Sequence, residues 1–110
     1  MNRNGPISFK VKRSRDYTLI EFELIREIIP EDLSNIEPPD PVKEGFSSSV
    51  VILSGRGPVW LYGYLIHFYH PTKAIAVFDP RLDAGVVVET HNPGMKVGDL
   101  IRREVFKQPG

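Results

Sequence analysis

The sequence predicts a single α/β domain, residues 1–110, built around one parallel βαβ unit. An apolar, mostly β-branched run at 50–53 leads into a glycine turn at 55–57, then into a helical pattern and a second apolar run at 74–78. A chain of 110 residues has the length of one domain, and 41% apolar residues can fill one core. We therefore expect a small mixed sheet with an N-terminal β-hairpin, the βαβ unit and a C-terminal antiparallel hairpin.

The first third of the chain predicts the hairpin and a short helix. Apolar residues alternate with polar ones over 7–12 and again over 17–24, as on half-buried strands, and residues 13–16 between them predict a turn. Residues 30–36 predict a short helix, because a proline and two acidic residues occupy its first turn. The three prolines within 38–41 predict a loop.

The βαβ unit begins with the strand that ends at Ser54. Gly55 and Gly57 allow a sharp turn because neither carries a Cβ atom. Pro58 suits the first position of a helix, and apolar residues then recur at helical spacing until His70. Pro71 prevents the helix from continuing, so a second strand is expected over 74–79.

The C-terminal third predicts further strands. Residues 81–85 predict a turn, and 86–90 a strand that returns antiparallel to the strand at 74–78. Residues 100–106 predict a last strand, and 107–110 a frayed tail.

Composition excludes several classes of protein. The 14 basic and 14 acidic residues give no net charge, unlike proteins that bind long nucleic acids non-specifically. The absence of cysteine excludes disulfides and thiolate metal sites. The N-terminus lacks an apolar signal core, and no apolar run approaches the roughly 20 residues of a membrane span, so we expect a cytoplasmic protein.

Strand direction places two sets of polar residues at opposite edges of the expected sheet. The carboxyl ends of both parallel strands share one edge, which therefore carries Ser54, Arg56, Asp79 and Arg81. Backbone N–H groups at a helix start and planar guanidinium groups both suit a phosphate. This edge is expected to bind a phosphate-bearing ligand.

The opposite edge is expected to carry His70 and His91. His70 closes the helix, which rises ~18 Å away from the glycine turn, and His91 follows the antiparallel strand. One protomer cannot bring both sets of residues to one atom. Two protomers stacked head to tail can, and such contacts can propagate into filaments.

Each of these residues also has a purely structural explanation. Asp79 before Pro80 is a common way to start a turn, and Arg81 suits a surface ion pair. His67 and His70 share a helix face, but a pair of histidines alone is too few ligands for a metal. The aromatic pair at Trp60 and Tyr64 can stack on bases, although such pairs more often lie in a core or an interface.

Taken together, these motifs resemble a small CRISPR-associated ring nuclease family of type III systems, in the Csx series. The resemblance covers Tyr17 to Ile101. It is carried by these segments in this order: Ser54 to Leu61, Tyr69-His70, Ala76 to Leu82, Val86 to Val88, His91 and Gly98-Asp99.

The resemblance implies a Rossmann-like fold related to CARF sensor domains. It implies manganese-dependent cleavage of cyclic tetra-adenylate, the second messenger of type III antiviral defence, with the ring held between two dimers of a homotetramer. An earlier interpretation of such proteins is an exonuclease that removes adenylates from RNA 3′ ends. The functional positions of the family match His70, Asp79, Arg81 and His91.

The working hypothesis is a Mn²⁺-dependent phosphodiesterase, with Asp79 and His70 as metal ligands from different dimers and His91 as a ligand or general acid/base. Alternatives are a module that senses cyclic oligoadenylate without cutting it, and the RNA 3′-end exonuclease. The residues expected to bind the ring are Ser54, Gly55, Arg56, Gly57, Pro58, Trp60 and Arg81.

Overall fold

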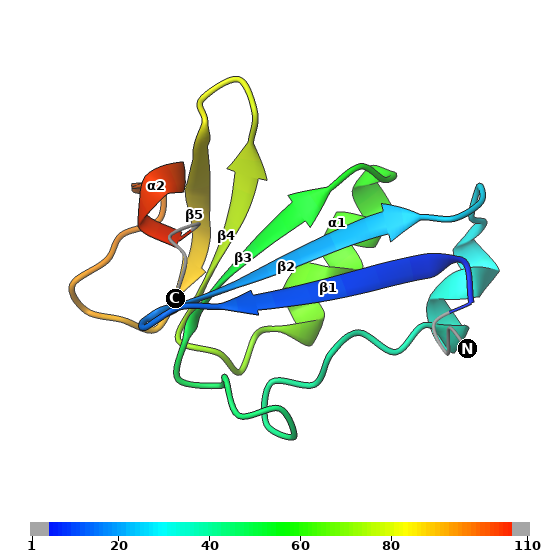
Figure 1. Ribbon diagram of the computed structural model, residues 1–110, viewed down its shortest axis with the longest axis horizontal. Helices are drawn as coiled ribbons and strands as arrows, with labels where there is room; N and C mark the ends of the chain where they lie inside the picture. The colour runs from blue at the N-terminus through cyan, green and yellow to red at the C-terminus, as the bar shows by residue number, and fades with distance from the viewer. Residues whose placement is uncertain (1–4, 107–110) are drawn as a thin grey trace.

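The computed structural model describes residues 5–106, which form one six-stranded sheet with few helices (Figure 1). In chain order the elements are β1 (Ile7–Arg13), β2 (Tyr17–Leu24), the 3₁₀ helix η1 (Pro30–Asn35), β3 (Val50–Gly55), α1 (Val59–Phe68), β4 (Ala74–Asp79), β5 (Ala84–Thr90), β6 (Leu100–Arg102) and α2 (Arg103–Phe106).

The strands lie side by side in chain order, from β1 to β6. The β2–β3 and β3–β4 pairs are parallel, whereas β1–β2, β4–β5 and β5–β6 are antiparallel. These pairings confirm the mixed sheet, the N-terminal hairpin, the βαβ unit β3–α1–β4 and the antiparallel return of β5.

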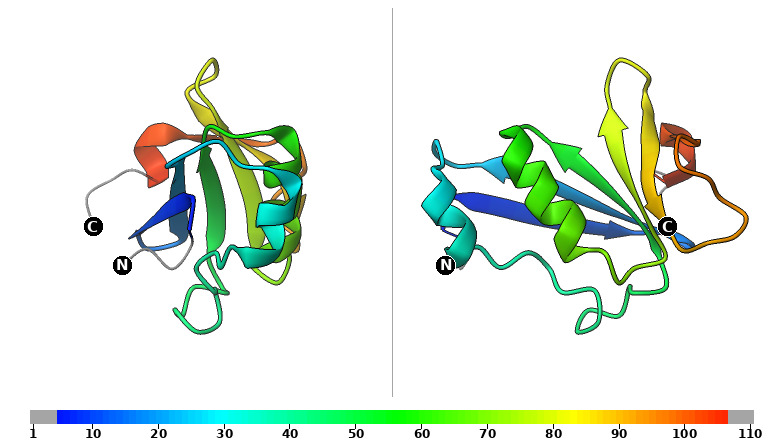
Figure 2. Two further views of the ribbon diagram at one scale, coloured as in Figure 1. Left: turned by 90° about the vertical axis from the view of Figure 1, so that its right-hand side faces the viewer. Right: turned by 180° about the vertical axis from the view of Figure 1, so that it is seen from behind.

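One face of the sheet, here called the helix face, packs against α1. Figure 2 shows α1 lying across this face when the molecule is seen from behind. Its buried core joins alternate strand residues such as Ile20, Val51 and Ile75 to Leu61 and Leu65 of α1. The long β2–β3 connection covers the same face through these buried side chains: Ile28, Ile36 and Phe46.

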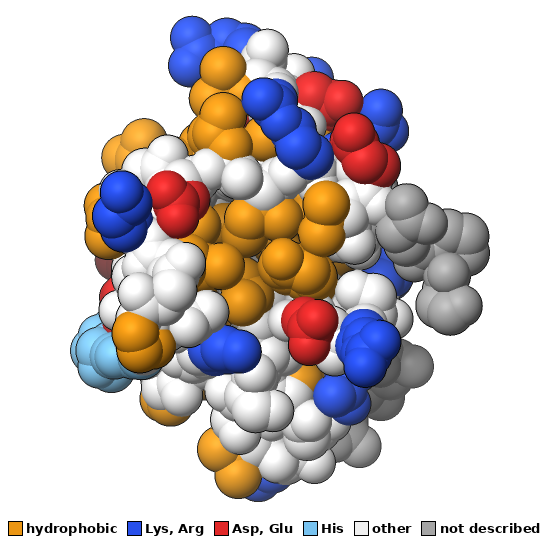
Figure 3. Space-filling model, turned by 90° about the vertical axis from the view of Figure 1, so that its left-hand side faces the viewer, with side chains coloured by type: hydrophobic (Ala, Val, Ile, Leu, Met, Phe, Trp, Pro, Cys, Tyr) orange, Lys and Arg blue, Asp and Glu red, His pale blue; other side chains and the backbone are white. Residues whose placement is uncertain are grey.

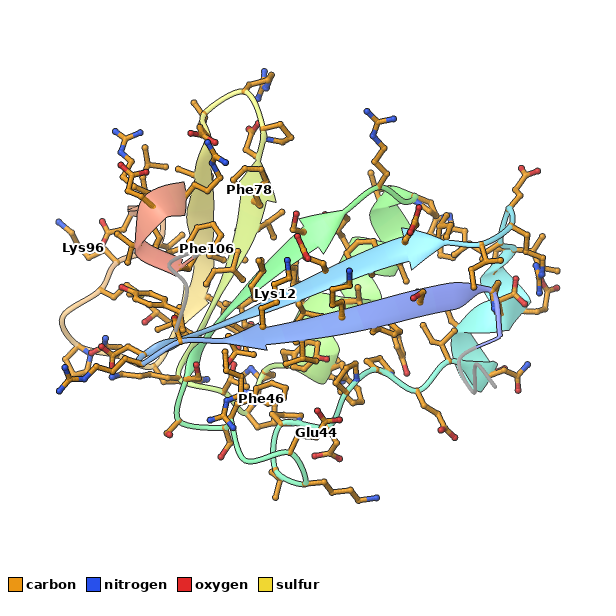
Figure 4. The ribbon with its side chains drawn as sticks, viewed as in Figure 1. Lys12, Glu44, Phe46, Phe78, Lys96 and Phe106 are labelled. Atoms are coloured by element: carbon orange, nitrogen blue, oxygen red, sulfur yellow. The ribbon has the colours of Figure 1, made fainter. Side chains whose placement is uncertain are left out.

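The opposite face, here called the open face, has a smaller core that α2 covers in part. Leu19, Ile52 and Val87 are buried there, as is Phe106 of α2. Figure 4 shows Phe106 beside Phe78 of β4, and their ring centroids are 6.1 Å apart. α2 also contacts β2, and no other helix among the described residues covers the open face.

Both parallel crossovers lie on the helix face, and the described strands run in sequence order without reversal. The ligand crevice of doubly wound sheets forms where strand order reverses, and this sheet contains no such point among the described residues. The Rossmann-like relationship therefore stays an expectation from the family resemblance.

The last predicted strand, over 100–106, is wrong in its second half. Only Leu100–Arg102 pairs with β5, and the chain then turns into α2. The helical turn places Phe106 against the open-face core, where it is 2% exposed. The predicted tail at 107–110 lies outside the described residues.

Two predicted boundaries also shift. The turn predicted over 81–85 is tighter, because β5 already begins at Ala84, which pairs with Asp79. Asp83 adopts a left-handed conformation in that turn, with φ 52°. Pro58 precedes α1 as its N-cap instead of being its first residue, and α1 ends at Phe68, before His70. Within the described part of the chain, no helix is long and apolar enough to cross a membrane.

Candidate functional site

The two predicted sets of polar residues lie at opposite ends of β4. Ala74 begins this strand and pairs with Thr90, next to His91, whereas Asp79 ends it and pairs with Ala84. The five residue-to-residue steps from Ala74 to Asp79 span about 17 Å in an extended strand. The strand directions inferred from the sequence are confirmed, and a single chain does not bring Asp79 to His70.

At the edge where β4 begins, His70, Glu89 and His91 converge, and we call them the histidine–glutamate cluster. His70 Nδ1 contacts Glu89 Oε2, and His91 Nε2 lies 3.7 Å from the same oxygen. The two imidazole rings have centroids 5.0 Å apart in an edge-on arrangement. The two histidine side chains are 60% and 51% exposed and Glu89 is 27% exposed, so the cluster opens to solvent.

Glu89 reaches this cluster because of a β-bulge. The pairing of β4 with β5 shifts between Ile75 and Ala76, so that Ala76 pairs with Val87 and Ile75 with Glu89. Val87 is buried in the open-face core, whereas Ile75 belongs to the helix-face core. The extra residue, Val88, therefore turns Glu89 to the helix face, where the turn that follows α1 places His70. Bulges commonly re-aim a side chain in this way.

Backbone contacts hold the two histidines in place. His91 N–H donates to the Lys73 carbonyl at 2.9 Å, and His91 Nε2 lies 3.1 Å from the His70 carbonyl oxygen. His70 N–H donates to the His67 carbonyl at 3.1 Å, at the end of α1. His67 itself is exposed and does not join the cluster.

The cluster fits a divalent cation. Its three ligand atoms all lie within 4.8 Å of one another. Two imidazoles and a carboxylate suit manganese or zinc, and one metal can draw such atoms together because its bonds to them are about 2.0–2.2 Å. From the sequence pattern, Glu89 is predicted only to lie in a strand. The available signal in the sequence was a carboxylate near the end of an apolar strand and two residues before a histidine.

At the other end of β4, Asp79 is bound to Arg81. Its carboxylate accepts the Arg81 backbone N–H at 2.9 Å and the Arg81 Nη2 group at 3.1 Å. These hydrogen bonds, from the guanidinium first, lower the pKa of Asp79 below its ordinary value. Arg81 Nε–H also donates to Asp79 Oδ1 at 3.4 Å, and because the Arg81 side chain is 87% exposed, its remaining N–H groups can meet an anion.

The end of β3 carries the predicted glycine turn. A Cβ atom on Gly55 would lie 2.4 Å from the Phe22 carbonyl oxygen, so this position requires glycine. The Tyr62 hydroxyl donates to the Gly55 carbonyl at 2.6 Å, which ties the turn to α1. Arg56 and Gly57 are exposed, whereas Trp60 packs partly against the helix-face core.

Four of the predicted ligand residues line one groove of about 780 Å³, namely Ser54, Gly55, Arg56 and Gly57. The groove continues onto β1 and β2, with a lining completed by Ser8, Lys10, Glu21, Phe22, Glu23 and Leu24. Sequence patterns do not reveal this extension, because the lining residues of β1 and β2 lie 30 or more positions before those of the glycine turn.

Comparison with known proteins agrees with the resemblance found in the sequence. A family model described as "CRISPR-associated protein (Cas_csx3)" matches residues 21–102. An uncharacterized protein of Aquifex aeolicus (strain VF5) is 60% identical over 99 residues, which cover 89% of each chain. The range that the family model matches spans the glycine turn, Asp79, Arg81 and the histidine–glutamate cluster.

Proposed function

Because the chain belongs to the CRISPR-associated Csx3 family, we propose that it is a manganese-dependent phosphodiesterase that cleaves cyclic tetra-adenylate. Cleavage of this messenger would switch off the type III antiviral response. The observation that carries the proposal is the convergence of His70, Glu89 and His91 at the edge opposite Asp79. A phosphate-binding edge and a metal-binding edge in one molecule suit a metal-dependent phosphodiesterase.

The metal assignment extends the one predicted from sequence. His70, Glu89 and His91 of one protomer would hold Mn²⁺, and Asp79 would approach from the stacked dimer. When bound, the ion would offset charge that develops on the phosphate. Glu89 is the added ligand, and it supplies the nearby carboxylate that a histidine pair alone lacks.

The remaining residues would bind and orient the ring. Arg81 presents a guanidinium already fixed by Asp79, and Arg56 presents one from the glycine turn. The Ser54 hydroxyl and the backbone N–H groups of residues 55 and 57 would donate to phosphate oxygens. Pro58 and Trp60 would shape the turn and the start of α1. His70 and His91 would each serve as a metal ligand or as the general acid/base that transfers a proton.

A second copy of the chain is part of this proposal, as a homotetramer of two stacked dimers. Apolar side chains stay exposed on the side of β5, β6 and α2, with Val88, Leu100 and Val105 each 40–43% exposed. Figure 3 views the molecule from this side and shows apolar side chains gathered in the middle of the surface between charged ones. Such patches commonly mark interaction surfaces.

The test is an assay with labelled cyclic tetra-adenylate and A-tailed RNA, each with Mn²⁺ or with EDTA. We expect ring cleavage that EDTA and His70→Ala abolish. His67→Ala is the matched control, because His67 is an exposed histidine in the last turn of α1, three residues before His70, but lies outside the cluster. A ring that is bound but intact would indicate a sensor, and shortened RNA beside an intact ring would indicate the exonuclease.

A further inference from the structure

The groove at the end of β3 continues across the open face of the sheet, beyond the glycine turn. Its volume of about 780 Å³ falls in the range of small-molecule sites, roughly 300–1,000 Å³. In Figure 1 the open face is turned toward the viewer, with α1 behind the sheet. The ends of β2 and β3 and the start of β1 therefore provide a second, wider part of the site.

The pairing of the strands places polar side chains side by side in this groove. Ser8 pairs with Glu23 and Lys10 with Glu21, while Ser54 of β3 pairs with Glu21 from the other side. Residues directly opposite on neighbouring strands have Cβ atoms about 4.5–5.5 Å apart. The intervening residues Phe9 and Phe22 turn to the helix face and pack there.

The groove mixes two cations with two carboxylates. Lys12, the next lysine on this face of β1, forms a 3.2 Å ion pair with Glu21, and Figure 4 shows Lys12 on the near side of the sheet. Within residues 5–106, no ion pair involves Lys10, Glu23 or Arg56, and all three are exposed. The second carboxylate, Glu23, would repel a simple anion, so the groove does not suit an anion alone.

We propose that this groove is a nucleotide subsite in which Lys10 and Arg56 bind phosphate and Glu23 reads the exocyclic amine of the base. A carboxylate accepts hydrogen bonds from the amine of adenine or cytosine and repels the carbonyl that replaces this amine in inosine. The choice of a nucleotide rests on the proposed function. The inference adds a basis for base selectivity and assigns it to the sheet face, away from the histidine–glutamate cluster.

The test uses mononucleotides, so that it does not depend on ring cleavage. Adenosine and inosine 5′-monophosphates are titrated at millimolar concentration into the ¹⁵N-labelled full chain. We expect adenosine monophosphate to shift amide signals of residues 8–10, 21–24 and 54–57. Inosine monophosphate should bind roughly tenfold more weakly, the effect of one charge-assisted hydrogen bond.

Three variants separate the roles. Glu23→Gln should remove most of the preference for the amine, because an amide group can donate to the inosine carbonyl as well as accept from an amine. Lys10→Ala should weaken both nucleotides by a similar factor. Lys43→Ala is the matched control, because Lys43 is exposed but lies in the β2–β3 connection outside the groove, and it should change neither.

Two results would overturn the proposal. One is that no amide signal of the groove residues shifts, even if signals of the histidine–glutamate cluster do. The other is an unchanged preference in Glu23→Gln. Ring cleavage is assayed separately on the same preparations. If the groove binds adenosine monophosphate but the protein leaves the ring intact, only the proposed phosphodiesterase activity is refuted. If the protein cleaves the ring but the groove binds no nucleotide, only the proposed subsite is refuted.

Discussion

The Glu89 carboxylate contacts the His70 ring on the helix face of the sheet, whereas Val87, two residues earlier in β5, is buried on the open face. Without the bulge, Glu89 would share the face of Val87, because side chains alternate along a strand. The bulge therefore makes a three-residue cluster out of a histidine pair. A structural irregularity that assembles donor atoms at an exposed edge indicates a site with a chemical role.

Glu89→Gln should weaken Mn²⁺ binding by roughly 10- to 100-fold, because a neutral amide replaces a charged ligand. Electron paramagnetic resonance of free Mn²⁺ during titration measures this directly. The control is Glu27→Gln, which removes an exposed carboxylate outside the cluster. If the two variants bind Mn²⁺ as tightly as the unmodified chain, the cluster is not the metal site.

The ion pair at the end of β4 predicts a pH effect. Arg81 lowers the pKa of Asp79 in the folded chain, so this pair stabilises the fold above the ordinary aspartate pKa of about 3.9 and ceases to do so as the pH falls through the lowered value. Arg81→Gln should return the Asp79 pKa toward its ordinary value and make acid unfolding less steep. Carboxyl ¹³C NMR titration measures the pKa.

Arg103→Gln is the control for that titration. It breaks the 2.8 Å ion pair between Arg103 and Asp83, in the turn next to Asp79, but leaves the Asp79–Arg81 contacts in place. Its Asp79 should titrate as in the unmodified chain. An Asp79 pKa that does not rise in Arg81→Gln would show that Arg81 is not its main partner in solution.

The glycine turn can be tested with two alanine substitutions. Gly55→Ala should destabilise the fold by about 1–3 kcal/mol, because its Cβ would meet the Phe22 backbone at 2.4 Å. Gly63→Ala, on the exposed side of α1 with nothing within 4 Å, should instead stabilise by about 0.5–1 kcal/mol. Urea unfolding measures both, and equal effects would refute the close approach at Gly55.

Local patterns were sufficient to predict most of the fold. The apolar runs at 50–53 and 74–78 and the glycine turn between them predict β3, β4 and their parallel pairing, and hence the two opposite edges. α2 could not be predicted this way. The sequence predicts that its four residues continue the last strand, whereas the helical turn buries Phe106 against the open-face core, which is a tertiary contact.

Glu89 and Lys10 could not be assigned to the site from sequence, and the physical reason is the same for both. The face to which Glu89 points depends on its pairing with Ile75, because the bulge reverses the alternation that β5 would otherwise follow. Lys10 lies in the groove because the β1–β2 pairing places it beside Glu21, and the β2–β3 pairing places Glu21 beside Ser54. Cross-strand register is a non-local property, so periodicity along the chain cannot reveal either residue.

The final prediction concerns the assembly. If each reaction centre combines the Asp79 edge of one copy with the histidine edge of another, His70→Ala and Asp79→Asn proteins should complement each other when refolded together. At equal amounts, about one quarter of head-to-tail junctions would then carry both intact edges. Asn keeps an acceptor for the Arg81 backbone N–H, which limits disturbance of the turn. Ring cleavage by the mixture is the measurement.

The matched control is a mixture of His70→Ala with His91→Ala. Both changes damage the same edge, so every junction lacks one imidazole and cleavage should not return. Recovery in the first mixture alone would therefore require that the two edges come from different copies, as their separation along β4 demands. If co-refolded His70→Ala and Asp79→Asn proteins form mixed oligomers without cleaving the ring at any ratio, the shared reaction centre is refuted.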